Sequence, residues 1–356
     1  MLIGIDASKV AEKERTGTEN YSKELIEALL NLAEAKKHEF RLYTKENIKW
    51  PRLWTQGGLA WECLRRPPDV LFVPAHTLPI IRWPKVKTVV TIHGLEYEYL
   101  PEYYQFPAKL YLTKSTEYAA RYADRLIAVS NWTKSELVSR LKAKPEKITV
   151  IYEGIGKRIL AAKDKQFSRE YLRQIRYKYG ITQDYILFIG TIQPRKNLVR
   201  LIEAFSKLDN QCELVIGGKQ GWLDEEIYQA PKRFGVEKRV KFIGRVAEAD
   251  LAAIYHSARL FCWPSLMEGF GLPVLEAMSL KVAVVTSNRG ALPEVVGEAG
   301  LLVNPEKVNE ISQAMKLVLE NQDLRQVLVE KGLAQIKKFS WKKAAQETLA
   351  VLTKGW

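Results

Sequence analysis

Cysteine and long apolar runs are scarce in this chain of 356 residues. Its three cysteines, Cys63, Cys212 and Cys262, stand far apart without a Cys-x-x-Cys pair, which argues against a disulfide framework or a zinc site and predicts reduced thiols. No apolar run approaches the roughly 18 residues that a membrane-spanning helix needs. Because the N-terminus also lacks the pattern of a signal peptide, we predict a cytoplasmic protein.

Positive charge is in excess. The chain has 55 Lys and Arg against 41 Asp and Glu, a formal net charge of +14, and the excess is larger in residues 1–175 than in the remainder. A basic surface attracts nucleic acid, anionic lipid or phosphorylated substrates. The charges are interspersed and no recognised binding motif accompanies them, so we predict no nucleic-acid partner and keep a non-enzymatic nucleic-acid-binding protein as an alternative.

Short β-branched runs alternate with amphipathic stretches along both halves of the chain. The expected strands are residues 2–6, 40–44, 70–73, 88–92, 126–129 and 148–151, then 185–189, 213–216, 240–243, 260–263, 282–285 and 300–303. The expected helices are residues 20–34, 132–141, 198–208, 249–256 and 272–279. Strands that are apolar throughout and alternate with helices indicate parallel sheets covered on both faces. The sequence therefore predicts an α/β fold with two doubly wound, Rossmann-like domains.

The length also fits two domains of ordinary size. We expect an N-terminal domain over residues 1–170 and a C-terminal domain over residues 171–340, with the seam in the charged stretch 154–184. The last helix, residues 341–356 after a Ser340 cap, is expected to pack back on the first domain. Ligands bind beyond the carboxyl ends of parallel strands, so the site is expected in a cleft between the two domains.

Two segments that follow strands in the first half are candidates for chemistry. Gly17 opens a helix, where main-chain N–H groups bind phosphate, although by itself a capping turn explains this glycine better. His93 follows the strand 88–92 and could bind a sugar hydroxyl or a reacting group, although a lone histidine is more often structural.

In the second half, the strand 185–189 is followed by Gly190 and then by Arg195 and Lys196, next to a helix start at Asn197. Two cations at the positive end of a helix are unfavourable unless an anion arrives. A diphosphate would satisfy both, because Arg binds it through two hydrogen bonds and Lys supplies a point charge.

The segment Leu266 to Met278, LMEGFGLPVLEAM, places Glu268 and Glu276 on either side of a glycine turn. Carboxylate oxygens suit the vicinal hydroxyls of a hexose or a ribose. The main-chain N–H groups of Gly269, Phe270, Gly271 and Leu272 are expected to face the same ligand. A carboxylate pair would also fit glycoside hydrolysis or a metal site.

Together these segments resemble the retaining glycosyltransferases of the GT-B fold, most closely glycosyltransferase family 4 (group 1). The resemblance covers nearly the whole chain and rests on E-x7-E at Glu268 and Glu276, on the segment from Gly190 to Asn197, on His93, and on RGALPEVVGEAGLLVNP at residues 289–305. The chain departs from the family in having His93-Gly94 for the usual His-Asp, and Glu153-Gly154 for the usual Asn-Gly.

The resemblance implies a role for each matching residue. Glu268 contacts the hydroxyls of the donor sugar, and Glu276 binds the donor ribose. Residues 269–272 hold the sugar and the diphosphate through main-chain amides. Arg195 and Lys196 neutralise the leaving diphosphate, Gly17 and Gly190 lie near the same phosphates, and His93 lies beside the reacting sugar. We expect Glu268→Ala to abolish transfer with nearly unchanged melting.

The implied function is transfer of a hexose, with a mannosyl-type donor favoured, from a nucleotide diphosphate sugar to a glycan or lipid-linked acceptor in cell-surface polysaccharide assembly. No Asp-x-Asp sequence occurs, so we expect neither a catalytic metal nor a cofactor. The basic, aromatic segment 101–125 suits peripheral contact with an anionic membrane on its inner face, and equally a helix that packs on the sheet with a basic outer face. A glycoside hydrolase is the enzymatic alternative.

Overall fold

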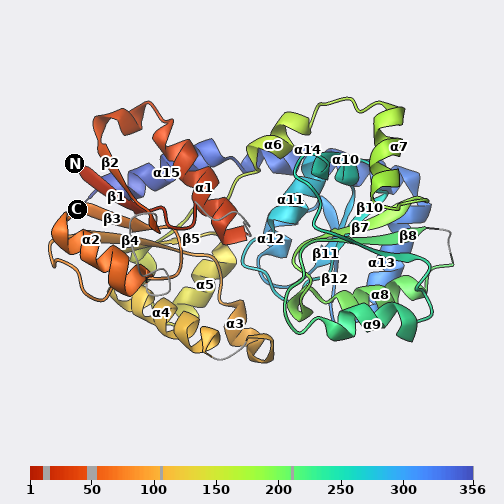
Figure 1. Cartoon of the computed structure of the whole chain (residues 1–356), viewed down its shortest axis with the longest axis horizontal. Helices are drawn as coiled ribbons and strands as arrows, with labels where there is room; N and C mark the ends of the chain where they lie inside the picture. Colours follow the sequence, from red (N-terminus) through yellow and green to blue (C-terminus); the bar gives the residue numbers. More distant parts are fainter. Residues whose placement is uncertain (11–16, 46–53, 105–106, 210–211, 356) are drawn as a thin grey trace. The chain divides into compact units, whose positions relative to one another are not determined.

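The computed structural model describes residues 1–10, 17–45, 54–104, 107–209 and 212–355 (Figure 1). These form two compact units, Met1–Gly154 with Phe339–Trp356, and Ile155–Lys338. The division falls earlier than the expected boundary at residue 170. The reason is local packing, because α6 (Lys157–Ala162) contacts α11 (Leu272–Ser279) within the second unit.

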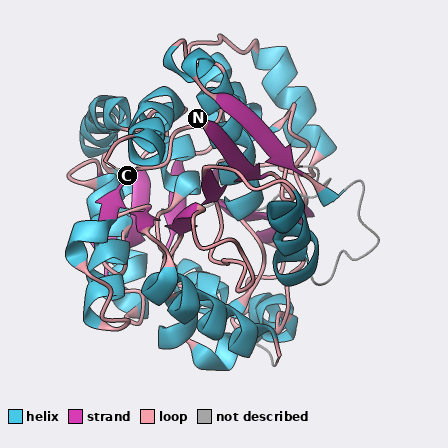
Figure 2. Cartoon of the chain, turned by 90° about the vertical axis from the view of Figure 1, so that its left-hand side faces the viewer, coloured by secondary structure: helices cyan, strands magenta, loops and turns pink. Residues whose placement is uncertain are grey.

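The first unit contains a parallel sheet of six strands in the order β2-β1-β3-β4-β5-β6. Its strands are β1 (Leu2–Asp6), β2 (Glu39–Tyr43), β3 (Val70–Val73), β4 (Lys87–Ile92), β5 (Arg125–Ala128) and β6 (Ile148–Val150). Its helices are α1 (Gly17–Leu30), α2 (Ala60–Arg65), α3 (Glu96–Tyr99), α4 (Ala108–Tyr122), α5 (Asn131–Ser139) and α15 (Trp341–Thr353). Helices flank the strands on both sides of this sheet (Figure 2).

The second unit repeats the plan, with strand order β12-β11-β10-β7-β8-β9 and parallel pairing throughout. Its strands are β7 (Tyr185–Ile189), β8 (Glu213–Gly217), β9 (Val240–Gly244), β10 (Leu260–Trp263), β11 (Val284–Ser287) and β12 (Gly300–Val303). Its other helices are α7 (Arg169–Lys178), α8 (Leu198–Ser206), α9 (Glu225–Arg233), α10 (Leu251–His256), α12 (Leu292–Val296), α13 (Val308–Glu320) and α14 (Gln322–Gln335). The expected α/β class and all twelve expected strands are confirmed, with shifts of one or two residues at some ends.

Burial on both faces explains why the central strands are apolar without alternation. Every residue of β3 and of β10 is buried. A strand in that position gains from each side chain, so the pattern Val-Leu-Phe-Val or Leu-Phe-Cys-Trp is stable only where helices cover both sides of the sheet. All three cysteines are buried, and none of them forms a disulfide.

The strand order reverses at one point in each sheet. In the first unit this point lies between β1 and β3, and in the second between β7 and β10. The loops that leave the carboxyl ends of such neighbouring strands run to opposite faces of the sheet and leave room for a ligand between them. These loops carry Gly17 and His76 in the first unit, and Lys196 and Glu268 in the second.

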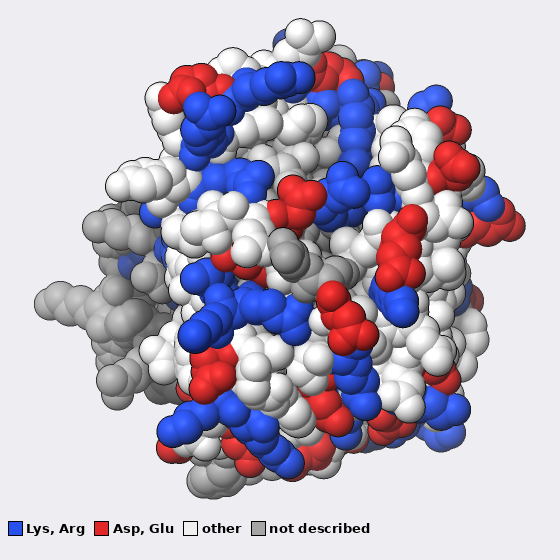
Figure 3. Space-filling view, turned by 90° about the vertical axis from the view of Figure 1, so that its right-hand side faces the viewer, with Lys and Arg blue, Asp and Glu red and all other residues white. Residues whose placement is uncertain are grey.

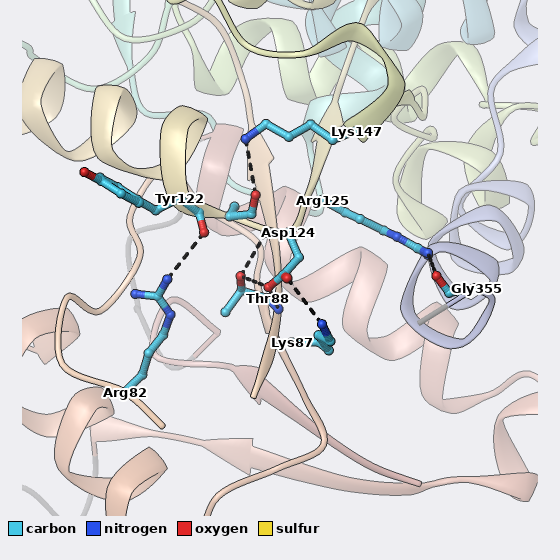
Figure 4. Close-up of polar contacts among 9 residues, drawn as sticks. Arg82, Lys87, Thr88, Tyr122, Asp124, Arg125, Lys147 and Gly355 are labelled. Atoms are coloured by element: carbon cyan, nitrogen blue, oxygen red, sulfur yellow. Dashed lines mark hydrogen bonds and ion pairs between the residues drawn. The ribbon is translucent and has the colours of Figure 1, made fainter. Parts of the chain in front are cut away.

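The last helix, α15, belongs to the first unit and packs on α1. The buried Trp341 ring lies edge-on to Tyr21 at 5.5 Å between centroids. Arg125 at the start of β5 donates hydrogen bonds to the carbonyls of Val351, at 2.7 Å, and Gly355, at 2.6 Å (Figure 4). Ser340 occupies the position before the helix, but its side chain makes no capping hydrogen bond, so this helix is held by packing and by Arg125.

Polar contacts fix the amino ends of β4 and β5 (Figure 4). The Asp124 carboxylate accepts hydrogen bonds from the main-chain N–H of Thr88 at 2.9 Å and from its hydroxyl at 2.8 Å. Lys147, just before β6, donates to the carbonyl of Ala123 at 3.2 Å. These contacts align the strands at their amino ends, and the candidate site lies at their carboxyl ends.

In the described part of the chain, each helix is too short or too polar to span a bilayer.

Gly154 gives a test of the α15 packing. A β-carbon at this position would lie 2.2 Å from the main-chain nitrogen of Trp341, which a side-chain rotation cannot relieve. We expect Gly154→Ala to destabilise the protein by about 1–3 kcal/mol, the usual cost of overpacking, measured by urea unfolding. Gly17→Ala is the matched control, because nothing lies within 4 Å of a β-carbon there. Equal stability of the two variants would contradict the packing described.

Candidate functional site

The loops after β7 and β10 are joined where the order of the second sheet reverses. The main-chain N–H of Leu266 donates to the carbonyl of Arg195 at 3.0 Å, and the Arg195 guanidinium donates to the carbonyl of Met267 at 2.8 Å. The two loops therefore form one surface at the carboxyl edge of the sheet.

The Glu268 carboxylate lies between both cations of the β7 loop. It accepts a hydrogen bond from Arg195 at 2.7 Å and another from Lys196 at 2.5 Å. All three side chains are 16% exposed or less. Burial by itself raises the pKa of Glu268, but the charges of Arg195 and Lys196 outweigh this effect and lower its pKa to about 2. Glu268 is therefore a carboxylate throughout the physiological pH range.

This arrangement corrects the electrostatic argument made from the sequence. Arg195 and Lys196 do lie beside the start of α8, but both already pair with Glu268, which offsets one of their two positive charges before any ligand binds. It also corrects the expectation that Glu268→Ala leaves melting unchanged. Removing one member of a buried ion pair leaves uncompensated charge and costs about 3–5 kcal/mol.

Asn197 holds three loops together at the same edge. Its backbone has φ 61° and ψ 32°, the left-handed conformation that asparagine tolerates better than most residues. Its amide donates to the carbonyls of Pro264 at 3.0 Å and Pro305 at 2.6 Å, which follow β10 and β12. Sequence reasoning saw Asn197 only as a helix start. Its hydrogen bonds to two distant loops carry no local sequence signal.

Packing explains why residue 190 is a glycine. A β-carbon on Gly190 would lie 2.6 Å from the Trp263 ring, and one on Gly218 would meet the Gly190 carbonyl. The Lys196 ammonium lies 4.5 Å from the centre of the same Trp263 ring, a cation–π contact that further fixes it. The role of Gly190 in donor binding stays a prediction.

The glycine turn between the two glutamates leads directly into α11. Gly271 precedes the helix with φ 124°, a conformation that favours glycine, and Phe270 is buried. Leu272 begins α11, as expected. Any contact of Phe270 with a ligand is therefore through its main chain, as predicted for the whole segment from Gly269 to Leu272.

Glu276 is partly buried on α11 and accepts a hydrogen bond from the hydroxyl of Tyr255 on α10 at 3.0 Å. Burial raises the pKa of Glu276 to about 7, although the hydrogen bond from Tyr255 acts in the opposite direction. Burial, with the nearby Glu276, raises the pKa of Tyr255 well above its usual range, so its hydroxyl remains a donor. Sequence reasoning missed Tyr255, which lies on a buried helix outside any motif.

The segment 289–305 packs against the main chain of Glu268. The main-chain N–H of Ala291 donates to the carbonyl of Glu268 at 2.9 Å. Gly290 has φ 62°, and a β-carbon there would lie 2.4 Å from that carbonyl. The turn that begins this segment therefore has to be small and left-handed, because it packs on the backbone of Glu268.

The two remaining predicted residues lie in the first unit. Gly17 begins α1, and no atom of the described residues lies within 4 Å of a β-carbon there, so their packing does not demand glycine. His93 follows β4, as expected, and its ring lies 3.4 Å from the Glu153 carboxylate and 3.0 Å from the carbonyl of Pro74. The acidic neighbour that the pair His93-Gly94 lacks in sequence is thus supplied by Glu153, from after β6.

In the described residues, neither the Glu268 cluster nor the surroundings of His93 forms a metal site. Among the residues that the structure describes, no group of three or more His, Cys, Asp or Glu side chains could hold a metal ion. Metal independence stays a prediction.

The raised pKa of Glu276 predicts a pH dependence of stability. The unfolded chain has the ordinary glutamate pKa of 4.5, so the folded protein holds this proton more tightly. The stability from this group is complete below pH 4.5 and is lost as the pH rises toward 7. We expect Glu276→Gln to be more stable than the wild type by about 2 kcal/mol at about pH 8, and the advantage to shrink at about pH 4. Urea unfolding at both pH values measures this, and an advantage that is the same at both would contradict it.

Comparisons with known proteins agree with this geometry. Residues 16–156 match the family described as Glycosyltransferase Family 4, and residues 173–335 match the family described as Glycosyl transferases group 1. O-antigen chain mannosyltransferase B of Escherichia coli is 34% identical over 270 residues, which cover 74% of this chain and 69% of that protein. Serotype-specific mannosyltransferase WbdA of Escherichia coli is 30% identical over 295 residues, and the match spans only 34% of its length.

The fold is shared with solved structures. Anabaena HepE in complex with UDP and glucose superposes with a TM-score of 0.73 at 19% sequence identity, over 99% of both chains. With two parallel six-stranded sheets, each covered by helices, this likeness shows a two-domain GT-B fold. The family matches and the relative at 34% identity together show that the chain belongs to the group 1 glycosyltransferases of glycosyltransferase family 4.

Proposed function

We propose that this glycosyltransferase moves a hexose, with retention at the anomeric carbon, from a nucleotide diphosphate sugar to a glycan or lipid-linked acceptor in cell-surface polysaccharide assembly. A mannosyl donor is favoured, because two relatives are named as mannosyltransferases, one of them for an O-antigen chain. The observation that carries the proposal is the buried cluster of Glu268, Arg195 and Lys196 where the strand order reverses.

The cluster suits the departure of a diphosphate. When the bond between the anomeric carbon and the phosphate oxygen breaks, its electron pair stays on the diphosphate, which becomes more negative. Arg195 and Lys196 are already fixed by Glu268, so little reorganisation opposes the stabilisation of this charge. Glu268 is ionised and accepts hydrogen bonds from the hydroxyls of the donor sugar, but it has no proton to give to a leaving group.

We assign the binding of the donor nucleoside to Glu276. Glu276 binds the ribose hydroxyls, and Tyr255 orients its carboxyl group through the oxygen that it hydrogen-bonds. The solved complex of Anabaena HepE contains UDP, which supports a nucleotide as a ligand of this fold. No cofactor or metal enters the proposed reaction, because fixed cations compensate the diphosphate.

Retention is proposed to follow a front-face displacement. The acceptor oxygen attacks the anomeric carbon from the side that the diphosphate leaves, and the acceptor proton passes to the departing phosphate oxygen. A glycoside hydrolase would need a protonated carboxyl beside the scissile bond and no nucleotide. Family membership favours transfer. The alternative of a nucleic-acid binder gains nothing from the charge distribution, since Lys and Arg lie among Asp and Glu over the face in Figure 3.

For the acceptor, we propose peripheral contact with an anionic membrane through an exposed apolar patch in the first unit. Trp61, Ile80, Ile81 and Trp83 are each at least 51% exposed. The Trp83 indole donates to the carbonyl of Leu64 at 2.8 Å, which places this segment beside α2.

The patch is flanked in the chain by exposed basic residues, namely Arg65, Arg66 and Lys85. Tryptophan and isoleucine surrounded by cations suit the headgroup region of a bilayer. This surface adds to the predicted segment 101–125, in which Leu110 and Tyr111 are exposed.

Turnover with purified nucleotide sugars tests the reaction. We expect transfer from one donor in a panel of GDP-, UDP-, ADP- and dTDP-sugars, with undiminished rate in a chelator and with the anomeric configuration retained in the product by NMR. Lys196→Met should lower kcat by about 100-fold or more, the scale of a lost transition-state charge interaction. Lys316→Met, which removes an exposed cation of α13, is the control. Inversion, or a Lys196→Met variant as active as the control, would contradict the proposal.

Vesicle co-sedimentation tests the membrane contact. We expect binding to phosphatidylglycerol vesicles at low salt that weakens as salt is added. Ile80→Ser with Ile81→Ser should lose most of this binding. Tyr177→Ser, which removes a side chain 87% exposed in the second unit, should retain it. Equal binding of the two variants would show that another surface contacts the membrane. If the wild type does not bind, the proposal of a membrane contact is wrong.

A further inference from the structure

The ring of His93 faces a hydrogen-bond acceptor at each nitrogen. Its Nε2 lies 3.0 Å from the carbonyl oxygen of Pro74, and its Nδ1 lies 3.4 Å from Oε1 of Glu153. The side chains of His93 and Glu153 are 13% and 6% exposed, so water has little access to either contact.

These partners determine where the protons are. A main-chain carbonyl only accepts, so Nε2 of His93 carries a hydrogen. If Nδ1 carried none, its lone pair would face a carboxylate oxygen, which is repulsive. A second hydrogen on Nδ1 turns the same contact into a charge-assisted hydrogen bond. A buried glutamate is stable in the ionised form when it is paired in this way.

The neighbouring histidine is held in the neutral form. Nε2 of His76 accepts a hydrogen bond from the main-chain N–H of His93 at 3.4 Å, and its Nδ1 lies 3.4 Å from the hydroxyl of Thr116. Burial, with the charge of His93 and that of Lys9, lowers the pKa of His76 to about 3. The two ring centroids are 5.5 Å apart.

The other groups around the ring agree with a single cation there. Tyr21 of α1 meets the His93 ring edge-on at 4.5 Å, and its hydroxyl, whose pKa is raised by burial, bonds to Thr91 at 3.2 Å. The Glu96 carboxylate of α3 lies close to Gly94, since a β-carbon on Gly94 would be 2.6 Å from it. Trp341 of α15 covers Tyr21 and adds no titratable group.

We propose that Glu153 is a positioning residue that holds His93 as an imidazolium, so that His93 supplies a fixed positive charge and no free nitrogen to accept a proton. The part that concerns transfer rests on the function proposed above and on the place beside the reacting sugar that the family resemblance implies for His93. His93 then stabilises negative charge as the diphosphate departs, and the acceptor proton goes to the departing phosphate.

The pair also explains two departures of the sequence. Glu153 replaces the usual asparagine after β6, and Gly94 replaces the usual acidic residue after the histidine. In this chain a carboxylate therefore stands after β6, at Glu153, and none stands directly after His93.

Histidine-ring NMR on the whole chain tests the protonation without any substrate. The chain has four histidines, and His93→Asn identifies the resonances of His93. At neutral pH we expect both ring nitrogens of His93 to appear protonated. In Glu153→Gln the amide donates to Nδ1, so that nitrogen should shift to the unprotonated range. An unprotonated Nδ1 in the wild type, or no change in Glu153→Gln, would overturn the proposal.

Activity then tests the consequence. Glu153→Gln should lower kcat by about tenfold at neutral pH, the scale of one charge-assisted hydrogen bond, and the loss should deepen as the pH rises. The control is Glu136→Gln, which alters a buried glutamate paired with Arg140 and should leave both the His93 resonances and the shape of the pH profile unchanged.

The NMR and activity measurements together distinguish failure of this proposal from failure of the proposed function. Expected resonances with wild-type kcat in Glu153→Gln would overturn the positioning role. A wild type that transfers no sugar from any donor, with the expected resonances, would overturn the proposed function and leave the imidazolium standing.

Discussion

A carboxylate buried between two cations is the interaction on which the second unit's functional edge depends. Glu268 accepts hydrogen bonds from Arg195 and Lys196, and each of these residues comes from a loop that leaves the sheet where its order reverses. Charges in such a place are costly unless they are paired and hydrogen-bonded. The pairing therefore fixes the two loops against each other.

The first unit also has polar side chains in contact at the carboxyl ends of its strands, but the residues are different. His93 and Glu153 also follow parallel strands, at the carboxyl edge of a sheet whose amino edge is tied by Asp124 and Arg125. In both units the apolar strands supply stability, and the charged side chains to which we assign chemistry lie at the strand ends. This division of labour follows from parallel sheets, because the carboxyl ends of neighbouring strands lie at one edge.

Strands, class and family could be predicted from the sequence, since continuous apolar runs and the ordered motifs are local signals. Residues that meet only in three dimensions could not. The contact of Glu268 with Lys196 joins loops 72 positions apart, and that of His93 with Glu153 joins loops 60 apart. The sequence therefore suggested isolated cations and a lone histidine. Tyr255 was missed for the same reason, because its partner Glu276 lies on another helix.

Calorimetric titration with GDP and GMP, or with the diphosphate and monophosphate of whichever nucleoside the enzyme prefers, tests the central claim most directly. If Arg195 and Lys196 hold a diphosphate, the wild type binds the diphosphate about 100-fold more tightly than the monophosphate, and Lys196→Met loses most of that difference. Equal affinity of the wild type for the two nucleotides, or a preference that survives in Lys196→Met, would contradict the account.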